Sequence, residues 1–87
     1  MTDASGVRSE MRTYIEENFL YLHPGIEVKD GDDFLTLGIV DSLGFVELVE
    51  EVQSRYGVAV EDVEITEENF GSIDAISDYV ERKRTAA

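Results

Sequence analysis

The chain has 87 residues, of which 43% are hydrophobic, and its 20 acidic and seven basic side chains give a formal net charge of −13. This length and composition predict one small globular domain over 1–87, with ends that fray over about 1–5 and 84–87. The acidic balance argues against nucleic-acid and anionic-membrane binding, which both need basic surface. Without cysteine, the chain has no disulfide framework, thiolate metal site or thiol nucleophile.

Targeting signals are not evident. No apolar run approaches the roughly 18 residues of a membrane span, and the first residues lack the basic and apolar regions of a signal peptide. We therefore expect a cytoplasmic protein, and a monomer, because the expected core uses up the apolar residues.

The first predicted element is a helix over about 5–19. Its apolar residues recur at the spacing of one helix face: Val7, Met11, Tyr14, Ile15 and Phe19. A long connection over 21–41 follows and is broken at His23-Pro24-Gly25. This connection carries too many large apolar residues for a solvent loop, so we expect it to lie against the helices and fill core. These residues are Leu22, Ile26, Val28, Phe34, Leu35, Leu37, Ile39 and Val40.

A second helix is predicted over Ser42–Tyr56, with Gly57 as its C′ residue. Its expected buried stripe consists of Leu43, Val46, Val49, Val52 and Tyr56, widened by Phe45 and Leu48. Gly44 in the first turn has two interpretations: the helix tolerates it there, or it leaves room for a group to pass close to the backbone.

A short helical turn is predicted over 66–70, with Thr66 as its cap and Phe70 as its anchor. Gly71 ends this turn, and Ser72 caps the last helix. The buried stripe of that helix is Ile73, Ile76, Tyr79 and Val80. The elements together predict an all-α fold, a small four-helix bundle of three main helices and a short third helix, with a long first loop.

The residue inventory offers little catalytic chemistry. The single histidine, His23, lies beside Pro24, and Ser42 has neither a G-x-S-x-G elbow nor a base nearby in the sequence. The acidic pairs at 32–33, 61–62 and 67–68 lack the spacing of a calcium loop. We therefore expect no catalytic residue, no metal site and no enzymatic activity.

The start of the second helix carries the main functional signal. Asp41 and Ser42 precede its periodic apolar residues, so the Ser42 hydroxyl lies at a helix N-terminus, where free N–H groups and the macrodipole favour negative charge. Two interpretations follow. Ser42 is a helix cap and nothing more, or it is a position where a phosphate is attached.

The segment from Leu37 to Val49, LGIVDSLGFVELV, resembles the signature of acyl carrier proteins. The resemblance extends from about residue 7 to 83 and includes the order of the helices and the long first loop. It implies that Ser42 receives 4′-phosphopantetheine from coenzyme A, by the action of a phosphopantetheinyl transferase with magnesium. The arm would supply the thiol that the chain lacks, and cargo would be carried on it as a thioester.

The same resemblance implies a recognition surface around Ser42. Its residues are Asp41, Leu43, Phe45, Val46, Glu47, Glu50 and Glu51. The aspartate would orient the serine for the transferase, and the three apolar residues would offer contacts near the arm. The glutamates would meet basic patches on the transferase and on acyl-activating, acyl-transferring and synthase enzymes. The alternative is that these glutamates form an ordinary solvated helix face.

Departures from the family pattern bear on the cargo. The position after Asp-Ser-Leu, often acidic or polar in fatty-acid carriers, is Gly44 here, and Phe45 follows it. Glu50 stands where those carriers often present an apolar contact. The Gly-Gly-[HD]-Ser pattern of modular peptide-synthetase carriers is absent. The resemblance therefore favours a free-standing carrier of acyl or similar small acid cargo in polyketide, secondary-metabolite or other specialised biosynthesis. The alternatives are a peptidyl or aminoacyl carrier, and an unmodified acidic helical interaction module.

Overall fold

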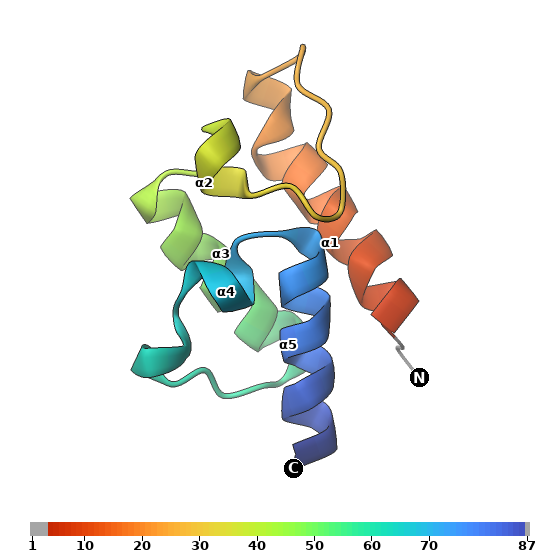
Figure 1. Cartoon of the computed structure of the whole chain (residues 1–87), viewed down its shortest axis with the longest axis vertical. Helices are drawn as coiled ribbons and strands as arrows, with labels where there is room; N and C mark the ends of the chain where they lie inside the picture. The colour runs from red at the N-terminus through yellow and green to blue at the C-terminus, as the bar shows by residue number, and fades with distance from the viewer. Residues whose placement is uncertain (1–3, 87) are drawn as a thin grey trace.

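Every regular element in residues 4–86, the part of the chain that the computed structural model describes, is helical (Figure 1). The three long helices are α1 (Ala4–Asn18), α3 (Ser42–Tyr56) and α5 (Ile73–Ala86). The short elements are α2 (Phe34–Leu37), α4 (Glu67–Phe70), and the 3-10 turns η1 (Leu20–Leu22) and η2 (Asp62–Glu64). The predicted all-α bundle of three main helices and a short helix is confirmed. The single turn α2 is an addition, since we expected irregular chain there.

The core lies where the long helices meet. α1 contributes Val7, Met11 and Ile15, and α5 contributes the whole predicted stripe of Ile73, Ile76, Tyr79 and Val80. The long connection fills core as predicted, through the buried side chains of Val28, Phe34, Ile39 and Val40. Leu22 is an exception. Its side chain is 64% exposed in the η1 turn, so its expected burial is wrong.

Polar contacts fix the long connection to the helices on both sides of it. The Arg12 guanidinium of α1 donates to the Val28 carbonyl over 2.7 Å and pairs with Asp30. The Asp30 carbonyl accepts from the Asp74 N–H over 2.9 Å, and the Phe34 N–H donates to the Gly71 carbonyl over 2.8 Å. The connection is therefore held against α1 and against the start of α5.

The turn α2 forms because both its ends have suitable residues. The Asp33 carboxylate accepts from the N–H groups of Leu35 and Thr36 over 2.9 and 3.1 Å, which is an N-cap. Gly38 ends the turn at φ 75°, in the left-handed region that glycine adopts without a Cβ penalty.

Glu64 joins η2 to α5. Its Oε1 accepts from the Glu61 N–H over 3.0 Å, the Tyr79 hydroxyl over 2.9 Å and the Lys83 ammonium over 3.0 Å. The Glu61 N–H and Lys83 lower the pKa of Glu64, because hydrogen bonds and positive charge favour the ionised carboxylate. Burial and the bond to Glu64 raise the pKa of Tyr79 to about 12.

Most of the predicted helix ends are confirmed. Gly57 follows α3 at φ 65°, and the Ser72 hydroxyl accepts from the Ala75 N–H over 3.0 Å. Thr66 is at the N-cap position of α4, but its side chain makes no capping bond, so that part of the prediction is wrong. α1 begins at Ala4 and α5 continues to Ala86. Parts of the ends that we expected to fray, 1–5 and 84–87, are therefore helical. Residues 1–3 and 87 lie outside the described part.

The lengths and compositions of the helices bear on membrane insertion. Among residues 4–86, no helix combines the length and the apolar content that a membrane crossing requires.

Candidate functional site

Asp41 caps α3. Its backbone is extended, at φ −96° and ψ −174°, and its Oδ1 accepts from the Gly44 N–H over 2.8 Å. Its carbonyl accepts from the Phe45 N–H, also over 2.8 Å. Ser42 is the first residue within the helix and is exposed. The interpretation of Ser42 as the cap is therefore wrong, because the aspartate before it makes the capping bond.

The exposed Ser42 hydroxyl lies at an end of α3 that can bind an anion. The N–H groups of Ser42 and Leu43 make no hydrogen bond within residues 4–86. Free N–H groups in a first turn, together with the helix dipole, favour a negative group. A phosphodiester on Ser42 therefore fits the donors that this turn offers.

The turn before Ser42 is fixed in place. The Ile39 N–H donates to the Phe34 carbonyl over 3.2 Å, and the side chains of Ile39 and Val40 are buried. The chain segment that leads into Ser42 is therefore fixed by its hydrogen bond to α2 and by its buried side chains.

The buried face of α3 differs from the predicted stripe. Leu48, Val49, Val52 and Tyr56 are buried. Leu43 and Val46, expected in the core, are 69% and 50% exposed, so their predicted burial is wrong. Apolar residues occur around much of this helix, and the positions of α1 and α5 decide which of them are covered. We define the exposed face of α3 as Ser42, Leu43, Val46, Glu47 and Glu50, which follow helical spacing on one side.

Phe45 lies between the surface and the interior. Its side chain is half-buried, and its ring meets the Phe70 ring edge-on, with centroids 6.4 Å apart. The Phe70 ring in turn contacts the Tyr79 ring, with centroids 4.8 Å apart. Phe45 therefore joins α3 to α4 and α5, and presents less surface than Leu43 or Val46.

The three glutamates of the predicted recognition surface differ in their partners. Glu47 and Glu50 are exposed and make no ion pair within the described part of the chain. Glu51 pairs with Arg55 on the same helix over 2.7 Å. Its charge is therefore partly neutralised, whereas the charges of Glu47 and Glu50 remain open to a partner.

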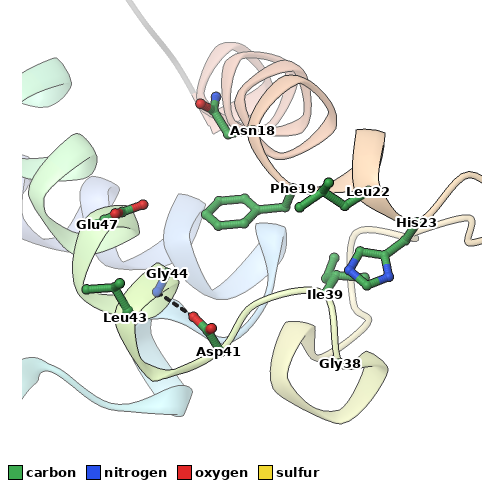
Figure 2. A pocket seen from close by; sticks show the side chains of 10 residues that line it. All are labelled: Asn18, Phe19, Leu22, His23, Gly38, Ile39, Asp41, Leu43, Gly44 and Glu47. Atoms are coloured by element: carbon green, nitrogen blue, oxygen red, sulfur yellow. Dashed lines mark hydrogen bonds between the residues drawn. The ribbon is translucent and has the colours of Figure 1, made fainter.

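A surface hollow of about 270 Å³ adjoins the start of α3 (Figure 2). One wall comes from the end of α1 and from η1, through Asn18, Phe19, Leu22 and His23. The other comes from the start of α3, through Asp41, Leu43, Gly44 and Glu47, with Gly38 and Ile39 between the walls. The structure thus brings Asp41, Leu43 and Glu47 together with residues from α1 and η1.

The position of Gly44 explains why the two walls can approach each other. A Cβ at Gly44 would lie 2.9 Å from Cε1 of Phe19 and 3.3 Å from Oδ1 of Asp41. The first distance is well below the usual separation of non-bonded carbon atoms, and the second is tighter than most contacts that a Cβ makes. Of the two interpretations, close passage of a group is the correct one, and the group is the Phe19 ring of the same chain.

The wall formed by α1 and η1 was missed by sequence reasoning, which treated Phe19 and Leu22 as core and His23 as part of a chain break. A glycine in the first turn of α3 was the only local sign of a close neighbour. Among the residues that the structure describes, no three His, Asp or Glu side chains gather as ligands for a metal ion.

Comparison with known families gives a match that agrees with this geometry. The family described as phosphopantetheine attachment site matches residues 12–80, which include the start of α3 and both walls of the hollow. A comparison with curated proteins gave no significant match. The chain belongs to the phosphopantetheine-attachment family, the carrier domains that hold covalently bound 4′-phosphopantetheine.

Proposed function

We propose that this protein is an acyl carrier protein of specialised biosynthesis and that Ser42 bears its 4′-phosphopantetheine arm. The observation that carries the proposal is the exposed Ser42 hydroxyl beside free N–H groups at the start of α3. A transferase can reach this hydroxyl, and the helix end favours the negative phosphodiester that would form there.

The four other serines whose side chains the structure describes are poorer candidates for modification. Ser72 also lies at a helix start, but its hydroxyl already accepts from the Ala75 N–H. Ser77 is fully buried. Ser9 and Ser54 are exposed within helices, where the surrounding N–H groups are already used by the helix. Ser42 combines accessibility with donors for a phosphate.

The modification itself needs an external catalyst. The Ser42 Oγ would form a bond to the phosphorus that carries the pantetheine of coenzyme A, and the bond from that phosphorus to the adenosine bisphosphate would break. The hydroxyl proton would pass to a base on the transferase, since none is evident beside Ser42. The bound arm supplies a thiol that holds cargo as a thioester. The chain provides the attachment point and performs no catalysis.

Carrier domains of this kind interact with phosphopantetheinyl transferases and with synthase enzymes. The exposed face of α3 suits such partners, because the apolar Leu43 and Val46 lie beside the unpaired carboxylates of Glu47 and Glu50. An apolar contact ringed by charges of one sign gives both affinity and steering. We assign smaller roles to Asp41, Phe45 and Glu51, whose side chains are largely engaged within the chain.

The cargo we propose is an acyl or similar small acid group of a polyketide or other secondary-metabolite pathway. Gly44 and Glu50 support this assignment, as they depart from the pattern of fatty-acid carriers. The protein would act as a cytoplasmic monomer that visits separate enzymes in turn.

Intact mass spectrometry tests the attachment site. The wild-type protein is incubated with coenzyme A, Mg²⁺ and a promiscuous phosphopantetheinyl transferase, and should gain the mass of one arm. Ser42→Ala should gain none, whereas the matched variant Ser72→Ala should be modified like the wild type. No gain on the wild type would refute the carrier function. A gain that persists in Ser42→Ala would refute the site.

A further inference from the structure

The hollow between the two walls has the composition of a small-ligand site. Its volume of about 270 Å³ is just below the range of roughly 300–1,000 Å³ for such sites, which combine apolar walls with a few polar groups. Leu22, Ile39 and Leu43 supply apolar surface, and Asn18, His23 and Glu47 supply polar groups. Figure 2 shows Leu22 and His23 across the hollow from Leu43 and Glu47.

The polar groups in the hollow have unused hydrogen-bonding capacity. The Asn18 amide N–H donates to the Tyr14 carbonyl over 2.9 Å, but its Oδ1 accepts no hydrogen bond from residues 4–86. The His23 ring and the Glu47 carboxylate likewise have no hydrogen-bond partner in that range. A ligand with amide groups, a hydroxyl and short apolar segments would satisfy them. Pantetheine has this chemistry.

We propose that the hollow holds the 4′-phosphopantetheine arm in a folded-back position and favours neutral or positively charged cargo over anionic cargo. The inference rests on the proposed attachment at Ser42, which lies between the lining residues Asp41 and Leu43. A tether of this kind holds a group at an effective concentration on the order of millimolar. Even weak affinity for the hollow therefore gives substantial occupancy.

The charge preference follows from the lining. The hollow includes the carboxylates of Asp41 and Glu47, and none of its lining residues is Lys or Arg. A carboxylate at the cargo end would meet like charges. For two charges about 6 Å apart in water, occupancy should fall about threefold.

NMR spectroscopy of apo and holo protein tests the resting position. On modification, resonances of Leu22, His23, Ile39 and the Asn18 side-chain amide should shift, and the arm methyls should show NOEs to Leu22. Leu22→Ala should remove these NOEs. Tyr21→Ala is the matched control, because Tyr21 is similarly exposed (66%, against 64%) on the same turn but does not line the hollow. Shifts confined to Ser42 and its sequence neighbours would overturn the proposal.

A second arm of the experiment separates this proposal from the attachment site. Free reduced pantetheine is titrated at millimolar concentration into Ser42→Ala, which cannot carry the arm. Saturable shifts at Leu22 and His23 support the hollow whether or not Ser42 is the attachment point. Normal loading of the wild type with no shift in either arm supports the attachment and overturns the hollow as the arm's site, which leaves it as a contact surface for a partner protein.

The charge preference is tested with two caps of similar size. The thiol of the holo protein is alkylated with iodoacetamide or with iodoacetate, which leaves a neutral or an anionic end. At pH 7.5 and low salt the neutral cap should give about threefold higher occupancy, judged from the His23 and Leu22 shifts, and Glu47→Gln should reduce the difference. Equal shifts for the two caps would overturn the preference.

Discussion

The capping bond at the start of α3 separates the structural role of Asp41 from the functional role proposed for Ser42. Asp41 accepts the Gly44 N–H over 2.8 Å, whereas the Ser42 hydroxyl is exposed and makes no capping bond. Asp41→Ala should therefore destabilise the fold, and Ser42→Ala should leave the free energy of unfolding almost unchanged.

The magnitudes follow from the groups removed. Loss of an N-cap side chain costs about 1 kcal/mol, and loss of a negative charge at the helix N-terminus adds about 0.3–1 kcal/mol. The sum for Asp41→Ala is about 1–2 kcal/mol, and a domain of this size loses about 4–8 °C in Tm for each kcal/mol. Ser42→Ala removes an exposed hydroxyl, so its effect should stay within about 0.5 kcal/mol.

Urea unfolding followed by circular dichroism, with thermal melts, measures both effects. Asp41→Asn is the control, since asparagine also caps helices and should recover most of the loss. Equal destabilisation by Asp41→Ala and Ser42→Ala would refute the assignment of the cap. The expected pattern makes Ser42→Ala a folded protein that cannot be loaded, so its failure in the mass assay would report on the site.

The remaining predictions concern charged groups. The pKa of Glu64 is lower in the folded protein than in the unfolded chain, so the ionised carboxylate stabilises the fold. This stabilisation is complete above the unfolded-state pKa of about 4.3, and it is lost as pH falls through the lower folded-state pKa. The difference in Tm between wild type and Glu64→Gln should therefore shrink below about pH 4, and a difference independent of pH would contradict this. Glu47→Lys should slow loading by the transferase several-fold at low salt but little at high salt, whereas Glu81→Lys on α5 should not; equal slowing would assign the effect to net charge. Added salt should raise the Tm, because the net charge of −13 opposes the compact state; a Tm indifferent to salt would remove that explanation.

The limits of α3 could be predicted because both its ends carry local signals, Asp41 before it and Gly57 after it. Its buried face could not, since Leu43 and Val46 are as apolar as Leu48 and Val52, and only the packing of α1 and α5 distinguishes them. The turn α2 was missed although Asp33 and Gly38 bracket it with a cap and a left-handed glycine, because one turn is too short to show a period.

The candidate site could likewise be predicted only in part from the sequence. Ser42 could be singled out from local sequence, because a helix start and its first residues are contiguous in the chain. The hollow could not, since Phe19 and Leu22 reach the start of α3 from the far end of the long connection. Arg12 anchors that connection to α1 through Val28 and Asp30, and no local pattern reveals these contacts.

The fixed turn before Ser42 has a consequence for how cargo travels. Ile39 and Val40 are buried and α2 is tied to the chain that follows it, so an arm on Ser42 would swing about a stationary pivot. Every thioester would then stay within the same maximum reach of one point on the protein. Each enzyme that uses such a carrier would place its catalytic centre within that reach of the surface where it docks. The extended arm would thus set an upper limit on the depth of the entrance tunnels of partners whose active sites are otherwise unrelated.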